Sequence, residues 1–229
     1  MMGEGKKKAV VFDLDDTLVS ERQYIQSGYR AVSAELSQRH DLDKQPVYEM
    51  LLDLFADSPK NVFNRLYDKL HIPYTEKDIR ELVELYRNHD PDIDFYDDVI
   101  PCVQTLKANA IMTGIITDGY ISTQRAKLNA LDAYQYFDHI VITEELGREY
   151  WKPHPRAFEM MKETLGVDYE NMVYIGDNPE KDFFIGSIYP IKTARISREG
   201  IYSGAMYLGG ISEDYTIDSL ADILTIMNI

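Results

Sequence analysis

The stretch KAVVFDLDDTL, residues 8–18, decides the fold. Val10 to Phe12 form a short apolar run of β-forming residues, which predicts a strand buried on both faces of a parallel sheet. The run ends abruptly in acid, with Asp13 and Asp15. Ligands of open α/β sheets bind beyond the carboxyl ends of the strands, and alternate residues of an extended segment point the same way. We therefore expect both carboxyl groups to converge on one site, where they repel unless a cation or a proton lies between them.

Three later stretches complete a pattern around this strand. Thr117 ends an apolar run in IITDG, Lys152 stands in WKP, and Asp177 belongs to GDNPEKD, residues 176–182. In this order the four motifs resemble those of the haloacid dehalogenase superfamily, whose first motif is an apolar strand followed by D-x-D-x-T. The resemblance covers nearly the whole chain. It implies an α/β fold with a doubly wound, Rossmann-like parallel sheet and an inserted α-helical cap domain, of the type found in the first subfamily.

The glycine distribution predicts where the insert lies. No glycine occurs between Gly28 and Gly114, whereas a sheet core with tight strand-to-helix turns uses glycine. Inside this gap, Ser58-Pro59 predicts the N-cap and first residue of a helix, and Thr75 with Asp78 predicts a capping box. We expect a catalytic core at 1–18 and 95–229 and a helical cap at 19–94.

The remainder of the chain alternates between strand and helix patterns. Apolar runs predict strands, and apolar residues at helical spacing predict helices. The predicted strands are 111–117, 139–143, 172–175 and 192–196, and the predicted helices are 122–131, 155–165, 180–188 and 219–227.

Composition excludes several classes of partner. The 229 residues are 45% apolar and 28% charged, which is typical of a globular protein. A formal net charge of −15 argues against a nucleic-acid or anionic-membrane partner, and it means that local cations must attract a phosphorylated substrate. Cys102 is the single cysteine, so no internal disulfide forms. No apolar segment is long enough to cross a bilayer, and we expect a cytoplasmic monomer or homodimer.

The paired acids of the first motif indicate phosphoryl transfer. A carboxylate that attacks phosphorus forms an aspartyl-phosphate and divides one difficult displacement into two easier ones. The resemblance assigns this nucleophilic role to Asp13. It assigns to Asp15 the protonation of the leaving oxygen and the deprotonation of the attacking water, a role found in the phosphatases of the superfamily and missing from its true dehalogenases.

The other motif residues supply a metal site and phosphate contacts. Mg²⁺ prefers hard oxygen ligands, which Asp13 and Asp177 provide. The family pattern adds the backbone carbonyl of Asp15, and Asp182 is expected to act through water or through a hydrogen bond to a ligand. Lys152 can bind the nucleophile and the phosphate together. The hydroxyl of Thr117 and the amides around Asp118 and Gly119 can donate to phosphate oxygens.

The beginning of the insert offers two substrate contacts, Arg22 and Tyr24, although a solvated helix start explains Arg22 equally well. A lid over the site favours a small phosphomonoester, such as a sugar phosphate or a mononucleotide. Two other functions stay open: a phosphoglucomutase-like transferase, which uses the same four motifs, and a non-enzymatic phospho-accepting or binding module. A receiver-type domain is disfavoured because that fold is shorter and lacks a large insert after its first strand.

Overall fold

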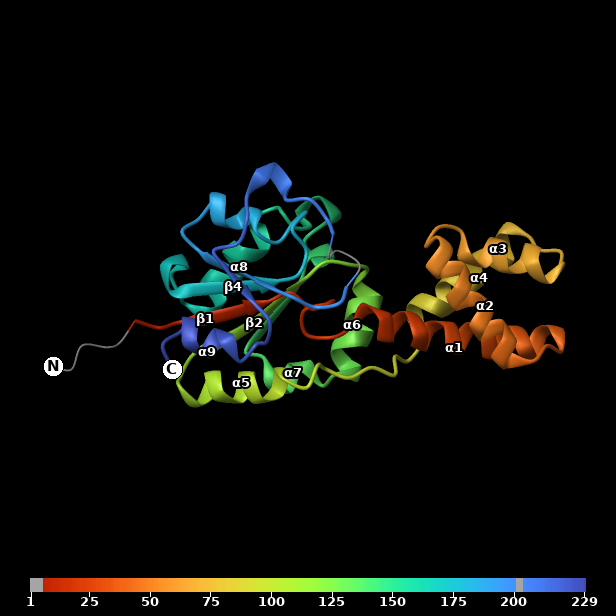
Figure 1. Cartoon of the computed structure of the whole chain (residues 1–229), viewed down its shortest axis with the longest axis horizontal. Coiled ribbons are helices and arrows are strands. Elements are labelled where there is room, and N and C mark those ends of the chain that lie inside the picture. Colours follow the sequence, from red (N-terminus) through yellow and green to blue (C-terminus); the bar gives the residue numbers. More distant parts are fainter. Residues whose placement is uncertain (1–5, 201–203) are drawn as a thin grey trace. The chain divides into compact units, whose positions relative to one another are not determined.

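The apolar run of the first motif forms a central strand of a parallel sheet. The computed structural model describes residues 6–200 and 204–229, and within these ranges the sheet has six strands in the order β3-β2-β1-β4-β5-β6 (Figure 1). Every residue of β1 (Ala9–Phe12) is fully buried, and β1 pairs in parallel with β2 (Met112–Thr117) and β4 (Met172–Gly176). The α/β sheet predicted from the apolar runs is confirmed. The outer strands are β3 (His139–Ile142), β5 (Lys192–Ile196) and β6 (Tyr215–Ile217).

Helices cover both faces of this sheet. In Figure 1, α8 (Arg156–Leu165) lies on one side of the strands, and α5 (Val99–Ala108) and α9 (Asp222–Ile226) lie on the other. Successive strand residues point to opposite faces, so β1 contributes to both layers. Ala9 and Val11 pack in one cluster with Phe158 and Met161 of α8, whereas the Phe12 ring meets the Phe137 ring edge to face at 5.9 Å. Burial on both faces explains why this strand is a continuous apolar run. The remaining core helices are α6 (Ile121–Ala130) and α7 (Ala133–Tyr136).

The chain divides into two compact units. The core unit comprises the residues up to Glu21 and those from Asp94 onward, and the helical unit comprises Arg22–Ile93. Leu36, Leu51, Leu66 and Leu82 are fully buried in the helical unit, whose core is aliphatic and aromatic. Its helices are α1 (Glu21–His40), α2 (Lys44–Asp57), α3 (Val62–Leu70) and α4 (Glu76–Asn88).

One predicted cap in the helical unit is present and one is wrong. Thr75 and Asp78 form the predicted capping box at the start of α4. Ser58 is instead the C-cap of α2, with its N–H donating to the carbonyl of Leu54 at 3.0 Å. Because residues 58–61 turn the chain away from α2, α3 begins only at Val62, after Asn61 in a left-handed conformation with φ 53°.

The predicted helix at 180–188 is also wrong, since only a 3₁₀ turn, Phe184–Ser187, forms there. Side chains bind the backbone N–H groups that a helix start would use. Asp182 Oδ2 accepts from the Asn178 N–H at 3.0 Å, and Asn178 Oδ1 accepts from the Glu180 N–H at 2.9 Å. Such local bonds compete with helix formation.

Three further elements differ from the sequence pattern. The pattern did not predict α5 or β6 as separate elements, and α9 begins three residues later than expected. The Asp222 carboxylate accepts from the N–H groups of Asp218 and Ser219, both at 3.1 Å, which holds this segment in a turn before the helix. None of the helices in the described ranges combines the length and apolarity that a membrane crossing requires.

Candidate active site

Three neighbouring strands deliver acids and a hydroxyl to one edge of the sheet. Asp13 follows β1, Thr117 ends β2 and Asp177 follows β4. Phe12 of β1 is in register with Ile115 of β2 and with Ile175 of β4. Parallel strands in this register place their carboxyl ends together, where ligands of such sheets bind. Residues more than 100 positions apart in sequence are therefore brought to one place, as the motif order predicts.

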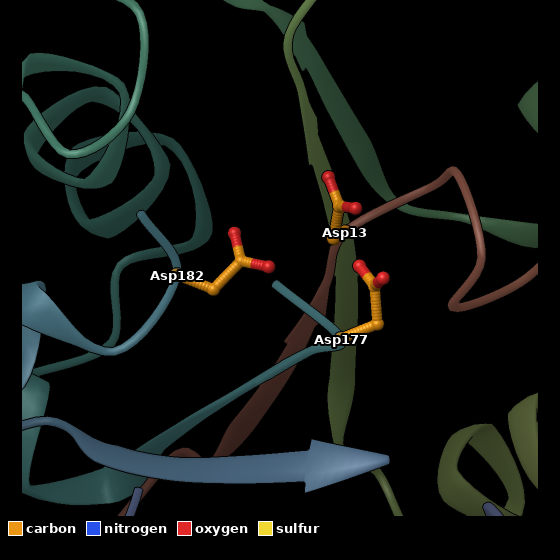
Figure 2. A group of neighbouring side chains, drawn as sticks. All are labelled: Asp13, Asp177 and Asp182. Carbon is orange, nitrogen blue, oxygen red and sulfur yellow. The ribbon is translucent and has the colours of Figure 1, made fainter. Parts of the chain in front are cut away.

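Three carboxyl groups form a buried cluster at this edge. One oxygen each of Asp13, Asp177 and Asp182 lies within 4.8 Å of the others, and Figure 2 shows the three groups facing a common space. All three side chains are buried. Hard carboxylate oxygens at this spacing suit Mg²⁺, which is bound through a few carboxylates and completes its shell with water or phosphate. The donor set therefore fits the magnesium predicted from the sequence.

Lys152 holds two of these carboxylates. Its Nζ lies 2.5 Å from Asp13 Oδ1 and 2.9 Å from Asp182 Oδ1, and it also donates to the Tyr174 hydroxyl at 2.9 Å. The Lys152 side chain is fully buried. Asp182 thus anchors the lysine, a direct contact that the sequence pattern did not predict.

Burial and neighbouring charges shift the pKa values of Asp13, Asp177 and Lys152. Burial, together with the charges of Asp13 and Asp182, raises the pKa of Asp177 to about 9. Burial also raises the pKa of Asp13 to about 6, although Lys152 opposes the effect. Burial lowers the pKa of Lys152, but Asp13 and Asp182 outweigh it and hold that pKa well above its ordinary value. The cluster has more negative than positive groups, which is the condition that a bound cation relieves.

Asp118 ties two lysine-bearing loops together. Its Oδ1 accepts from the Thr143 hydroxyl at 2.7 Å and from the Lys152 N–H at 3.1 Å, and its Oδ2 accepts from Lys181 Nζ at 3.1 Å. Burial raises the pKa of Asp118, but the charges of Lys152 and Lys181 outweigh it and lower the pKa overall. The side chain of Asp118 therefore supports the lysine loop, in addition to the backbone role predicted for this position.

Asp15 lies in a second hydrogen-bond network, formed with side chains of α6. Its Oδ1 accepts from Lys127 Nζ at 2.5 Å, and its Oδ2 accepts from Gln124 Nε2 at 2.9 Å. Gln124 Nε2 also lies 2.6 Å from Thr117 Oγ1. The two motif residues Asp15 and Thr117 are thus linked through a side chain of α6.

A pocket of about 440 Å³ in the core unit opens onto these groups. Predicted site residues that line it are Asp13, Asp15, Asp118, Lys152 and Asp177. Glu21 and Lys181 line it as well, and burial together with the charge of Asp15 raises the pKa of Glu21 to about 7. The remaining lining residues are Asp16, Trp151, Pro153, Asn178 and Glu180.

Comparison with known proteins decides the family. Residues 10–196 match the family model described as haloacid dehalogenase-like hydrolase. The chain belongs to this family. It is an enzyme of the phosphatase type, as the four motifs predicted.

Relatives of this haloacid dehalogenase-like hydrolase carry two kinds of name. The glyceraldehyde 3-phosphate phosphatase of Methanocaldococcus jannaschii is 29% identical, over 96% of this chain and 96% of that protein. The protein of the same name from Methanopyrus kandleri is 32% identical, over 83% of this chain and 84% of that protein. The pyrophosphatase PpaX of Bacillus cereus is 28% identical, over 97% of each chain.

Solved structures share the fold. A HAD phosphatase from Thermococcus onnurineus superposes with a TM-score of 0.61 at 25% identity, covering 96% of this chain and 97% of that one. A HAD-superfamily hydrolase of subfamily IA from Geobacter sulfurreducens has a TM-score of 0.67 at 17% identity, covering 99% of this chain and 100% of that one. These similarities confirm the predicted Rossmann-like architecture of the family.

The two substrate contacts predicted at the start of the insert, Arg22 and Tyr24, lie in the helical unit. Tyr24 is buried in that unit, and its hydroxyl lies 3.2 Å from the carbonyl oxygens of both Tyr86 and Arg87. Its ring also packs against the Tyr86 and His89 rings. Tyr24 therefore packs within the helical unit, and its contact with substrate stays a prediction. Arg22 is exposed, and its contact with substrate stays a prediction.

The backbone conformation at position 119 requires glycine. Its φ is +137°, a conformation that other residues rarely adopt, and an added Cβ would lie 3.1 Å from Gln124.

Asp16 adopts the left-handed conformation, with φ 53°, and its Oδ1 accepts from the Glu21 N–H at 2.9 Å. This bond connects the nucleophile loop to the first turn of α1.

Sequence reasoning missed four residues of the site, Gln124, Lys127, Lys181 and Glu21. Lys181 lies inside the fourth motif, so its place between Asp177 and Asp182 in the sequence could have indicated it. Gln124 and Lys127 are three residues apart on α6 and share a helix face, but nothing local indicates that this face meets Asp15.

Proposed function

We propose that this hydrolase is a Mg²⁺-dependent phosphatase that cleaves a small phosphomonoester through an aspartyl-phosphate on Asp13. The observation that carries the proposal is the buried Lys152 ammonium group, in contact with both Asp13 and Asp182 at the carboxyl edge of the sheet. Phosphoryl transfer needs a positioned nucleophile and neutralisation of the phosphate oxygens. A lysine held beside the nucleophile serves both needs.

Asp13 and Asp177 would hold the magnesium ion, together with the backbone carbonyl of Asp15. When bound, the ion supplies positive charge to the phosphate oxygens and reduces the repulsion between the carboxylates. Asp182 lies in the same cluster, but its two oxygens accept from Lys152 and from the Asn178 N–H. We therefore assign Asp182 to the support of Lys152 and of the loop that carries Asp177.

Asp13 is proposed as the nucleophile. A carboxylate oxygen of Asp13 attacks phosphorus while the bond from phosphorus to the leaving oxygen breaks. Lys152 Nζ, the Thr117 hydroxyl and the amides around Asp118 and Gly119 are proposed to donate to the phosphoryl oxygens. Thr117 Oγ1 accepts from Gln124, which leaves its own proton available for such a bond.

Asp15 is proposed to move the protons of both half-reactions. In the first, it gives a proton to the leaving oxygen, so that the product departs as an alcohol. In the second, it takes a proton from a water molecule that attacks phosphorus, and the bond from phosphorus to Asp13 breaks. Inorganic phosphate is released and Asp15 is again protonated.

The helical unit is proposed to act as the cap. Its two connections to the core unit begin side by side, because Val19 and Phe95 form an antiparallel bridge and the Tyr96 N–H donates to the Leu18 carbonyl at 3.0 Å. This bridge directly follows the nucleophile loop. A hinge there would let the cap select the leaving group, with Arg22 as the candidate contact.

The proposed substrates are small. The relatives are named for glyceraldehyde 3-phosphate and for pyrophosphate, and both compounds have the size that a capped pocket admits. A sugar phosphate or a mononucleotide fits the same class. With a net charge of −15 and a single cysteine, a cytoplasmic monomer or homodimer without nucleic-acid or membrane partners is part of this proposal.

A substrate screen tests the proposal. The purified chain is incubated with Mg²⁺ and with triose phosphates, hexose phosphates, mononucleotides, phosphoglycolate or pyrophosphate, and released inorganic phosphate is measured. We expect release from at least one small compound, loss of release in a chelator, and recovery when Mg²⁺ is restored. Isomerised phosphorylated product without phosphate release would indicate the mutase instead, and full activity in metal-free buffer would contradict the mechanism.

A further inference from the structure

Both carboxylate oxygens of Asp15 are bound by one helix. Lys127 Nζ donates to Oδ1 at 2.5 Å and Gln124 Nε2 donates to Oδ2 at 2.9 Å, and both donors belong to α6. The side chain of Lys127 is 4% exposed, whereas that of Asp15 is 23% exposed, and Asp15 lines the pocket. A carboxylate that accepts one bond at each oxygen cannot rotate freely, so its plane is fixed relative to α6.

The Gln124 amide joins this carboxylate to the phosphate-binding strand end. Its Nε2 lies 2.9 Å from Asp15 Oδ2, 2.6 Å from Thr117 Oγ1 and 2.8 Å from the carbonyl oxygen of Asp118. An amide nitrogen carries two hydrogens, so it can serve these three acceptors only by sharing. A shift of any one acceptor therefore alters the bonds to the other two.

The ion pair between Lys127 and Asp15 is costly to break. Removal of one partner from a buried ion pair leaves an uncompensated charge, which is strongly unfavourable. Lys127 is buried and forms an ion pair with Asp15, and the Glu21 carboxyl group contributes further charge nearby. The ion pair therefore favours the orientation of Asp15 in which Oδ1 meets Lys127 and Oδ2 meets Gln124.

We propose that Lys127 and Gln124 are positioning residues that hold the Asp15 carboxyl group at the angle required for proton transfer to the leaving oxygen. This inference rests on the proposed role of Asp15 and adds the two residues through which the core unit controls it. Neither residue touches the nucleophile Asp13 in any described bond, so both act through Asp15, with Gln124 acting in addition through Thr117.

Leaving-group dependence separates this role from a structural one. We would measure kcat/KM with Mg²⁺ for an aryl phosphate, whose leaving group departs without a proton, and for glycerol phosphate, whose leaving group needs one. General acid catalysis contributes about 10²- to 10⁴-fold. Lys127→Gln is expected to lose about 10²-fold on glycerol phosphate and less than about 10-fold on the aryl ester. Lys127→Arg should recover much of the loss, and Lys107→Gln, which removes a half-exposed lysine from α5, is the matched control.

A double-mutant cycle tests whether Lys127 acts through Asp15. In the Asp15→Asn background, Lys127→Gln should add no further loss on either substrate, since coupled residues are non-additive. Gln124→Met keeps the side-chain volume without donors and is expected to show the same leaving-group dependence, with an added rise in KM through Thr117. Thermal melting of each variant establishes that it is folded. If Lys127→Gln prevents folding, the leaving-group dependence of Gln124→Met tests whether α6 positions Asp15.

Two failures are distinguishable. Equal losses on both substrates, or additive losses in the double variant, would overturn the positioning role while the wild-type activity stands. If Asp15→Asn itself shows no leaving-group dependence, or if the wild type releases no phosphate, the proposed function fails instead.

Discussion

The two units bury different chemistry. Along the carboxyl edge of its sheet, the core unit buries Asp13, Asp177, Asp182, Lys127 and Lys152. The helical unit buries aliphatic side chains, tyrosines and Phe63, and the polar groups that it does bury are uncharged serines together with His89. Its charged side chains stay partly exposed, as in the pairs of Arg39 with Glu35 and Glu81.

This difference separates groups that serve reactivity from groups that serve stability. Burial of a carboxylate costs free energy, which appears in the core unit as the raised pKa values of Asp13 and Asp177. Burial of an aliphatic side chain stabilises by about 1.5–3 kcal/mol, which is the main source of stability in the helical unit. Substitutions in the two units should therefore alter different measurements.

The strongest test removes the nucleophile. Asp13→Asn is expected to lower turnover by at least about 10⁴-fold, because no carboxylate is left to attack phosphorus. The melting temperature should stay close to that of the wild type, since the neutral amide removes the like-charge repulsion with Asp177 and Asp182 but also weakens the buried contact with Lys152. Steady-state kinetics and thermal unfolding give the two values. A variant that lost activity only because it unfolded would break the contrast between the units.

The reverse test creates a cavity in the core of the helical unit. Leu82 is fully buried in its core cluster, and Leu82→Ala is expected to reduce the free energy of unfolding by about 2–5 kcal/mol. Leu85→Ala, at a partly buried position of the same helix, is the control with a smaller expected loss. Denaturant unfolding measures both. Leu82→Ala should keep its activity on an aryl phosphate at temperatures where it is folded, and a direct loss of the chemical step would contradict this division.

A third test concerns a charge in the core unit that contributes to stability. Asp98 accepts from Arg198 Nη2 at 2.7 Å, from the Leu220 N–H at 2.9 Å and from the Ser219 hydroxyl at 3.1 Å. Burial raises the pKa of Asp98, but these bonds outweigh it and hold the pKa below its ordinary value. Asp98→Asn is expected to cost about 2 kcal/mol at pH 7, since hydrogen bonds to charged groups contribute about 1.5–3 kcal/mol.

The sign of the pH dependence follows from the lowered pKa of Asp98. The stabilisation is complete above the unfolded value of about 3.9 and is lost as the pH falls through the lower folded value. Unfolding curves of wild type and Asp98→Asn should therefore converge below about pH 4. A difference that grew in acid would show that Asp98 is buried at a net electrostatic cost, like the cluster around Asp13.

The smallest expected effect is at a helix cap. Thr75 Oγ1 accepts from the Asp78 N–H at 3.4 Å, and Asp78 Oδ2 accepts from the Thr75 N–H at 2.7 Å. Thr75→Ala is expected to cost about 1 kcal/mol in unfolding free energy, with kcat unchanged. Thr75→Ser keeps the hydroxyl and serves as the control. A change in kcat larger than the change in stability would mean that α4 contributes to the reaction.

Some features of this protein were determined by the sequence alone. Val10 to Phe12 are apolar at every position because β1 is buried on both faces, so the strand and the acid that ends it can be recognised locally. The capping box at Thr75 and the glycine that ends α8, Gly166, are likewise local. The resemblance of the four motifs to those of the superfamily then predicted which acids serve one site, and the structure places them at the carboxyl ends of adjacent parallel strands.

Other features depended on the tertiary structure. The Lys127–Asp15 pair joins residues 112 positions apart, and the Lys152–Asp182 pair joins residues 30 apart. Each depends on the packing of a helix or loop against the sheet, which no local pattern specifies. The packing of Tyr24 was not predicted for the same reason, because its burial against Tyr86 and His89 comes from helix packing. Short-range periodicity determines secondary structure and strand ends. The partner of a buried charge is determined only by tertiary packing, because segments distant in sequence must come together to exclude water from the charge.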